Sequence, residues 1–367
     1  MLLAGVLAAC GAGAPASQPT SAKASQASPA ASGAWEQLLA EARKEGTAVT
    51  IAPPFPALRQ AYTEQFKKDT GIELEYLGLP TNEGSARAER EAIAGKPSMD
   101  VLVGGGSEVL TLVPKGLLQP IAPMLAMPEV ADRSKWQDGK LMYMDKEQQF
   151  MLRTASTVYG GLLVNTKLVP QGSIGSWNDL LKPEWQGKII SFNPRSPGPG
   201  AGEASNLLSR LGADYVSKLY LGQKVAYSSD ERAVVEGVAR GTYAMALASA
   251  FQFVEQLKKE GFPLDMIFPE GAPGYLSGGY SVVKVPKGAP HPKAGAVFVN
   301  WFAGRAAQEM YSKIVLEASR RVDVDKSVVP GYIQPKPGVD YLDQYSFEWY
   351  TGSRKEALDK VAEILGR

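Results

Sequence analysis

The chain has 367 residues, enough for about two domains on the usual scale of roughly 100 to 200 residues per domain. Its 39 basic and 38 acidic residues give a formal net charge of +1, and without a dense basic cluster we expect no nucleic-acid partner. The single cysteine, Cys10, and single histidine, His291, exclude a disulfide, a Cys/His zinc site and a Cys–His dyad within one chain.

The chain begins with a short apolar stretch that ends in a lipobox-like sequence. Leu7-Ala8-Ala9-Cys10, followed by Gly11, resembles the bacterial lipoprotein signal, in which the cysteine receives the lipid. Residues 1–9 carry no Lys or Arg, so we expect the true leader to begin upstream. Residues 1–10 are therefore interpreted as a truncated signal with Cys10 as the lipidation site. The alternative is a chance Ala-rich start.

Residues 11–34 are nearly all Ala, Ser, Gly, Pro and Gln, and Lys23 is the one charged residue among them. Such a segment cannot bury enough apolar surface to offset the entropy lost on ordering. It is therefore predicted to be a disordered tether between the lipid anchor and a globular body.

From Trp35 onward, helical and strand patterns alternate along the chain. The patterns predict helices at 35–43, 58–70, 85–94, 204–211, 232–239, 251–260, 293–302, 306–316 and 354–365. They predict strands at 48–52, 72–77, 99–103, 160–164, 188–192, 224–227, 244–247 and 280–285. Repeated β-α-β units indicate an α/β protein with two mostly parallel sheets flanked by helices.

Several fragments, in order, resemble family 1 extracellular solute-binding proteins of bacteria. These are Phe66-Lys67-Lys68-Asp69-Thr70-Gly71-Ile72, Asp100-Val101-Leu102-Val103-Gly104-Gly105, Ser176-Trp177-Asn178-Asp179-Leu180-Leu181 and Trp185-Gln186-Gly187-Lys188-Ile189, followed by Val238-Ala239-Arg240-Gly241 and Phe298-Val299-Asn300-Trp301-Phe302. The ordered set is similar to the ferric-ion, polyamine, thiamine and phosphonate branch of that family.

The resemblance implies a two-lobed periplasmic-binding-protein fold joined by crossover strands. Lobe one would comprise 35–157 and a return at 277–367 with the C-terminal helices, and lobe two would comprise 158–276. It further implies a lipid-anchored, monomeric solute-binding protein at the outer face of the cytoplasmic membrane, working with an ABC permease and its ATPase. No catalysis, cofactor or metal is expected. The alternatives are a ferric-ion-binding protein, a surface enzyme and a sensor module.

Ligands of open α/β sheets sit beyond the carboxyl ends of the strands, so the loops there are candidates for binding. The loop at 193–202 follows a predicted strand and precedes a helix expected to start near Glu203. Backbone N–H groups at a helix start favour anions, and an arginine adds a bidentate clamp. The predicted contacts in this loop are Arg195, Ser196, Gly198 and Gly200. The alternative is a plain strand-to-helix connection.

Other strand-following loops supply the remaining predicted contacts. In lobe one these are Pro53, Gly104, Gly105 and Ser107, and in lobe two Ser229 and Ser249. Phe251 and Tyr280 are added, although aromatic residues also fill cores. Ferric-ion-binding relatives carry adjacent tyrosines where this chain has residues 249–253, which include no tyrosine. Because hard ferric iron favours anionic oxygen ligands, the sequence favours an anionic organic solute over free iron.

Overall fold

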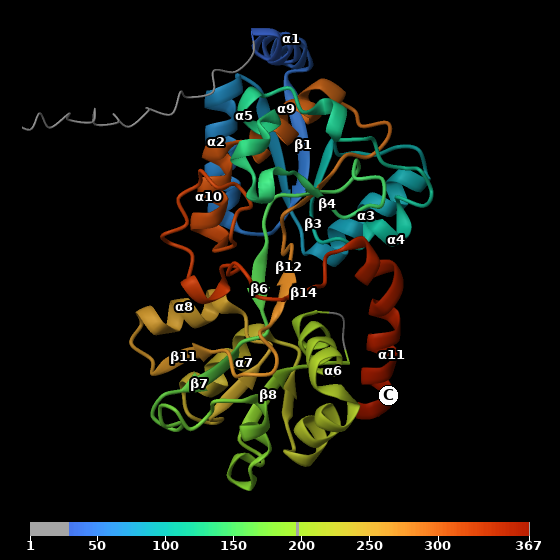
Figure 1. Cartoon of the computed structure of the whole chain (residues 1–367). Coiled ribbons are helices and arrows are strands. Elements are labelled where there is room, and N and C mark those ends of the chain that lie inside the picture. The colour runs from blue at the N-terminus through green and yellow to red at the C-terminus, as the bar shows by residue number, and fades with distance from the viewer. Residues whose placement is uncertain (1–28, 196–197, 367) are drawn as a thin grey trace, which may run out of the picture.

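The computed structural model describes residues 29–195 and 198–366. Figure 1 shows two lobes, one above the other, joined by strands between them. The predicted lipidation site Cys10 and residues 11–28 of the predicted tether lie outside the described residues. Helix α1 begins at Pro29, so residues 29–34 of the predicted tether are helical. No described helix combines the length and apolar character needed to span a membrane.

Lobe one contains a six-stranded sheet with the order β2-β1-β3-β13-β5-β4. Its strands are β1 (Thr47–Ala52), β2 (Glu73–Gly78), β3 (Val101–Gly104), β4 (Met142–Tyr143), β5 (Leu152–Arg153) and β13 (Val282–Lys284). Its helices are α1 (Pro29–Glu45), α2 (Pro56–Thr70), α3 (Thr81–Ile93), α4 (Glu108–Thr111), α5 (Pro128–Ala131), α9 (Pro292–Ala303) and α10 (Arg305–Val315).

Helix α2 shows how the local sequence produces this lobe. Tyr62 and Phe66 are four residues apart, so they share the helix face that is buried against the rings of α9, including Trp301. Burying each such side chain contributes roughly 1.5–3 kcal/mol. The helix ends at Gly71, whose φ of 76° places the backbone in the left-handed region that glycine tolerates best.

Lobe two contains a five-stranded sheet with the order β11-β7-β10-β8-β9. Its strands are β7 (Leu162–Asn165), β8 (Ile189–Phe192), β9 (Ala226–Ser228), β10 (Met245–Leu247) and β11 (Leu264–Ile267). Its main helices are α6 (Pro199–Ser217), α7 (Glu231–Ala239) and α8 (Phe251–Lys259). Short helical turns complete the chain at η1 (Ala122–Met124), η2 (Arg133–Lys135), η3 (Gln137–Gly139), η4 (Trp177–Leu181), η5 (Pro183–Trp185), η6 (Lys218–Gly222), η7 (Gly331–Ile333) and η8 (Trp349–Ser353).

The predicted α/β class is confirmed, but each sheet is mixed and not mostly parallel. In lobe one, β1 pairs in parallel with β2 and β3, whereas β13 pairs antiparallel with both β3 and β5. In lobe two, β10 pairs in parallel with β8 and antiparallel with β7. The reason is topological. Strands joined by β-α-β units enter the sheet from the same end and are parallel, whereas β7 and β13, which follow the crossing segments, enter from the opposite end.

Three segments cross between the lobes and form a small sheet of their own, in the order β14-β12-β6. They are β6 (Thr157–Tyr159), β12 (Tyr275–Ser277) and β14 (Leu342–Asp343). The predicted lobe limits, between 157 and 158 and between 276 and 277, fall within β6 and β12. The third crossing was not predicted. Asp343 is held in β14 by the buried Arg153, whose Nη1 lies 2.7 and 2.9 Å from the two carboxylate oxygens.

The third crossing moves the end of the chain to lobe two. Helix α11 (Arg354–Leu365) lies along α6 (Figure 1), and its apolar residues Val361 and Leu365 are buried in the same core cluster as Leu207 of α6. The prediction that the C-terminal helices all belong to lobe one is therefore wrong for α11. Only helices α9 and α10 return to lobe one.

Candidate ligand-binding site

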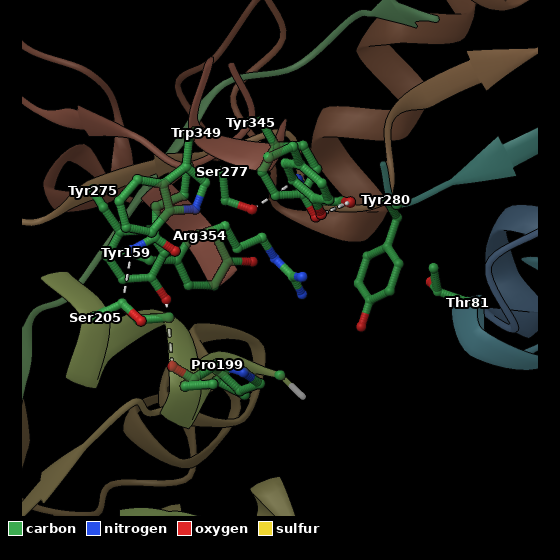
Figure 2. A pocket seen from close by; sticks show the side chains of 18 of the residues that line it. Thr81, Tyr159, Pro199, Ser205, Tyr275, Ser277, Tyr280, Tyr345, Trp349 and Arg354 are labelled. Atoms are coloured by element: carbon green, nitrogen blue, oxygen red, sulfur yellow. Dashed lines mark hydrogen bonds between the residues drawn. The ribbon is translucent and has the colours of Figure 1, made fainter. Parts of the chain in front are cut away.

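A cavity of about 270 Å³ lies between the lobes, at the level of the crossover strands. Figure 2 labels ten of the side chains that line this cavity, and they come from both lobes and from the C-terminal segment. The residues from lobe one and the crossovers are Thr81, Gly105, Tyr159, Tyr275, Ser277, Gly279, Tyr280, Gln344 and Tyr345. Those from lobe two and the C-terminal segment are Gly198, Pro199, Ala201, Gly202, Ser205, Glu231, Ala250, Gln252, Trp349, Tyr350, Arg354 and Leu358.

Aromatic rings form much of the wall, contributed by five tyrosines and Trp349. Tyr159 and Tyr275 stack with ring centroids 5.8 Å apart, and Tyr345 meets Tyr350 edge to face at 5.8 Å. Tyr280 packs in the same way on a ring of lobe one. Burial raises the pKa of each of these phenols, so they are neutral hydroxyl groups at neutral pH. The walls thus offer apolar faces and hydrogen-bonding hydroxyls together.

Arg354 is the one cationic side chain among the described residues that line the cavity. It is the first residue of α11, and its guanidinium carbon lies 5.0 Å from the centre of the Tyr350 ring. In Figure 2 it extends from the side of Tyr345 and Trp349 toward Tyr280. Within ranges 29–195 and 198–366, no carboxylate lies within 4.0 Å of it. Its positive charge is therefore directed into the cavity without a counter-ion among the described residues.

The beginning of α6 forms the facing wall. Gly198 precedes the helix, and Pro199, Ala201 and Gly202 in its first turn line the cavity. The first N–H groups of a helix have no partner within the helix and carry its partial positive charge. Ser205, one turn further on, is buried, and its Oγ has no hydrogen-bond partner among the described residues. Pro199 has no N–H, and the N–H of Gly202 donates to the carbonyl oxygen of Gly198 at 3.1 Å. This wall therefore presents chiefly the Ser205 hydroxyl and the positive end of the helix dipole to the cavity.

Glu231 is the one carboxylate among the described lining residues, and it sits in the first turn of α7. The cap of that helix is formed by its neighbour Asp230, which accepts from the N–H groups of Arg232 and Ala233. Burial, and then the charge of Asp230, raise the pKa of Glu231. In the described part of the chain Glu231 makes no ion pair or side-chain hydrogen bond.

The loop that follows β3, which contains Gly105 and Gly106, is held in place by a buried ion pair. Lys284 Nζ donates to the carbonyl oxygen of Gly105 at 2.6 Å and lies 3.1 Å from Glu108 Oε2. Both charged side chains are buried, with exposed fractions of 0% for Lys284 and 1% for Glu108. The pair therefore sets the position of Gly105 in the cavity wall.

Three of the residues predicted from the sequence line this cavity, namely Gly105, Gly198 and Tyr280. Two neighbours of these residues have packing roles instead. Gly104 is paired with Val282 in the sheet. A side chain at Gly200 would place its Cβ 2.3 Å from the carbonyl oxygen of Phe192, so that glycine allows α6 to approach β8.

Arg195, the predicted anion clamp, does not line the cavity. Its Nε and Nη2 donate to the carbonyl oxygens of Gly366 and Leu365 at 2.9 and 2.5 Å, and the guanidinium covers the Tyr227 ring. It thus caps the carboxyl end of α11, where unpaired carbonyls and the helix dipole favour a cation. The predicted role in ligand binding is not supported by this placement.

The remaining predicted residues lie elsewhere. The carbonyl oxygen of Pro53 is occupied by the Tyr76 hydroxyl at 2.6 Å. Ser107 and Ser229 are exposed outside the cavity. Ser249 and Phe251 are buried, and Phe251 packs on Tyr159 behind the cavity wall. Ser196 lies outside the described residues.

His291, the single histidine, is paired with a buried carboxylate. Its backbone N–H donates to Asp100 Oδ1 at 2.6 Å, and its Nδ1 lies 3.0 Å from Asp100 Oδ2. Neither residue lines the cavity.

The contacts from the far end of the chain, above all Trp349, Tyr350 and Arg354, were not predicted from the sequence. Their only signal was the aromatic density between residues 341 and 350.

The comparisons with known proteins agree with this architecture. A family model described as "Bacterial extracellular solute-binding protein" matches residues 61–318. An uncharacterized protein of Haemophilus influenzae is 23% identical over 338 residues, covering 88% of this chain and 92% of that protein.

Solved structures with the same fold include a periplasmic binding protein, AfuA, and the protein HitA. AfuA of Actinobacillus pleuropneumoniae, with fructose-6-phosphate bound, has 20% identity and a TM-score of 0.66, covering 87% of this chain and 98% of that one. Iron-bound HitA of Pseudomonas aeruginosa has 16% identity and a TM-score of 0.65, covering 87% and 99%. Since the family model spans more than half of the chain and the two-lobed fold accords with it, the protein belongs to the bacterial extracellular solute-binding protein family.

Proposed function

We propose that this protein is the solute-binding component of an ABC uptake transporter, and that it captures a small anionic organic solute between its lobes without chemical change. One observation carries the anionic assignment. Arg354 directs a guanidinium into the cavity, and no carboxylate of the described residues neutralises it. A cation in that setting gains a charge-assisted, bidentate partner when an acid group of the solute binds it.

Neighbouring groups support the same assignment. The start of α6 supplies the positive end of a helix dipole, and Ser205 and the neutral tyrosines supply hydroxyl groups. Among the solved structures, AfuA holds fructose-6-phosphate, which is an anionic organic solute. A cavity of about 270 Å³ suits a molecule of that general size more closely than a bare ion.

Ferric iron is the less supported solute, although the HitA structure contains bound iron. At the position where ferric-ion-binding relatives carry paired tyrosines, this chain has the buried Phe251. The tyrosines that line the cavity come from other segments, and burial raises their pKa. Formation of the phenolates that hard Fe³⁺ prefers is correspondingly costly.

An enzymatic role is also less supported than binding. General acid–base catalysis requires two titratable groups near the reacting atoms, with pKa values adjusted to opposite tasks. Of the described lining residues, Glu231 is the one carboxylate, and no histidine accompanies it.

A sensor module is the remaining alternative. A permease gene and an ATPase gene beside the coding sequence would favour a transporter over a sensor.

Family membership implies an extracytoplasmic location, and lipid anchoring through Cys10 is part of the proposal. Expression behind a complete lipoprotein leader should place the protein in the membrane fraction, because acylation of Cys10 adds the apolar chains needed for stable anchoring. The Cys10→Ser variant should appear in the soluble fraction. Equal membrane retention of the two proteins would disprove the anchor.

The role of Arg354 can be tested with matched ligands and a matched variant. Fructose 6-phosphate, organophosphonates and dicarboxylates should raise the melting temperature of the protein, whereas fructose should not. At a hundredfold excess over Kd, binding adds about 2.7 kcal/mol to the free energy of unfolding. Arg354→Met should weaken binding of the best anion at least about tenfold, which is roughly 1.4 kcal/mol.

Lys355→Met is the control, since it removes the same charge from the next position of α11, where the side chain is exposed and outside the cavity. Its affinity for the anion should stay within about twofold of wild type. If a solute without an acid group binds best, or if Arg354→Met binds as tightly as Lys355→Met, the anionic assignment is wrong.

A further inference from the structure

We propose that the solute is dipolar and carries, besides its acid group, an ammonium group that is bound at Glu231. This inference rests on the proposed function, because it concerns the same cavity and takes Arg354 as the partner of the acid group. The argument comes from the second unpaired charge in the cavity wall and from the rings that surround it.

The helix does not require the carboxylate of Glu231 for its own structure. Asp230 already accepts from the two N–H groups that a capping residue of α7 would satisfy. Glu236, on the same helix, is paired with Arg232 and Arg240 at 2.7 and 3.0 Å. Glu231 alone of these acids faces the cavity, and it has no cationic partner among the described residues.

The surroundings of Glu231 place it on the crossover side of the cavity. It lines the cavity together with Tyr275, the first residue of β12, and Tyr280, which precedes β13. Burial, and then the charge of Glu231, raise the pKa of Tyr280. Burial and the nearby Asp230 disfavour the ionised form of Glu231. An ammonium group of a bound solute would supply the missing positive charge. A neutral solute group would leave the buried carboxylate of Glu231 unpaired, so binding it there would be less favourable than binding the ammonium group.

Arg354 and Glu231 thus line one cavity with opposite charges, yet they do not pair with each other within 4.0 Å. Two unpaired opposite charges in one site are complementary to a solute with the reverse arrangement. The rings of Tyr280, Tyr345 and Trp349 line the same cavity and add to this, because the faces of aromatic rings attract cations. The geometry therefore favours an amino-phosphate, amino-phosphonate or amino-carboxylate.

Two pairs of probes isolate the contribution of the ammonium group: phosphoethanolamine against ethyl phosphate, and 4-aminobutyrate against butyrate. The members of each pair share the acid group, and only one member carries an ammonium group. We expect calorimetry to give the ammonium-bearing member of at least one pair an affinity higher by about tenfold or more. Glu231→Gln should abolish that advantage, and it should leave the affinity for ethyl phosphate or butyrate equal or slightly higher.

Glu236→Gln is the matched control, because it removes a carboxylate from the same helix outside the cavity. It should preserve the advantage of the ammonium-bearing probe. The anionic assignment and the dipolar solute fail separately. If Arg354→Met weakens binding of both members of a pair, but wild type binds the two members equally, the anionic assignment stands and the dipolar solute is refuted. An ammonium advantage that survives Glu231→Gln would refute the role of Glu231. If none of the four probes binds at about 10 mM, well above millimolar Kd values, while fructose 6-phosphate or a dicarboxylate does bind, the dipolar solute is wrong and the anionic assignment stands.

Discussion

Replacing Lys284 by methionine is expected to lower the free energy of unfolding by about 3–5 kcal/mol, because the substitution leaves Glu108 charged, buried and unpaired. Glu108 Oε1 already lacks a hydrogen-bond partner among the described residues, so no second group is available to compensate. The carbonyl oxygen of Gly105 also loses its donor. Urea denaturation followed by circular dichroism would measure the change.

The double variant Lys284→Met with Glu108→Met is the informative control. Removing both charges replaces a buried ion pair by apolar side chains of similar volume, which is often neutral or stabilising. Most of the lost stability should therefore return. A cost below about 1 kcal/mol for the single variant, or a double variant that is no more stable than the single one, would show that the pair does not act as described.

Glu203, in the first half of α6, should make the largest single carboxylate contribution to the pH dependence of stability, ahead of Glu317, whose pKa burial raises to about 7. The side chain of Glu203 is fully buried, and neither carboxylate oxygen has a hydrogen-bond partner among the described residues. Burial raises the pKa of Glu203 from its usual value of 4.5 to about 8 in the folded protein. Between these two values the unfolded chain releases a proton that the folded protein keeps, so stability falls as pH rises and levels off above about 8.

Glu203→Gln should remove the contribution of Glu203 to this dependence, because the amide cannot ionise. Relative to wild type, the variant should gain up to roughly 5 kcal/mol in unfolding free energy between about pH 5 and pH 9, at 1.36 kcal/mol for each pKa unit. The exposed Glu64 of α2 gives the control, since Glu64→Gln changes no buried charge. A difference between Glu203→Gln and wild type that is constant over this pH range would contradict the assignment.

The sequence predicts the alternation of helices and strands well, but not the edges of the sheets. Helix α11 begins and ends at the predicted residues, and β8 and β10 lie within one residue of their predicted bounds. The strands β4, β5 and β14 have two residues each, which is too short for a period of two to be recognised. Their positions are set by pairing with distant strands and by contacts such as that of Arg153 with Asp343.

The predicted site illustrates the same limit at the level of single side chains. Loops after strands do reach the cavity, and this rule located Gly105 and Gly198. The rule cannot tell which arginine enters the cavity. Arg195 lies in the predicted loop, but it is occupied by Leu365 and Gly366, which are about 170 residues away in the sequence. Arg354 reaches the cavity only because a third crossing brings α11 back against α6.

A crystal structure of the complex with the tightest-binding anion would test the central claim most directly. The proposed function predicts that the solute lies between the lobes, with its acid group within hydrogen-bonding distance of the Arg354 guanidinium and near the start of α6. Arg195 should still cap the end of α11. A solute bound outside the cavity, or an acid group held by Arg195 while Arg354 points away, would contradict the proposed function.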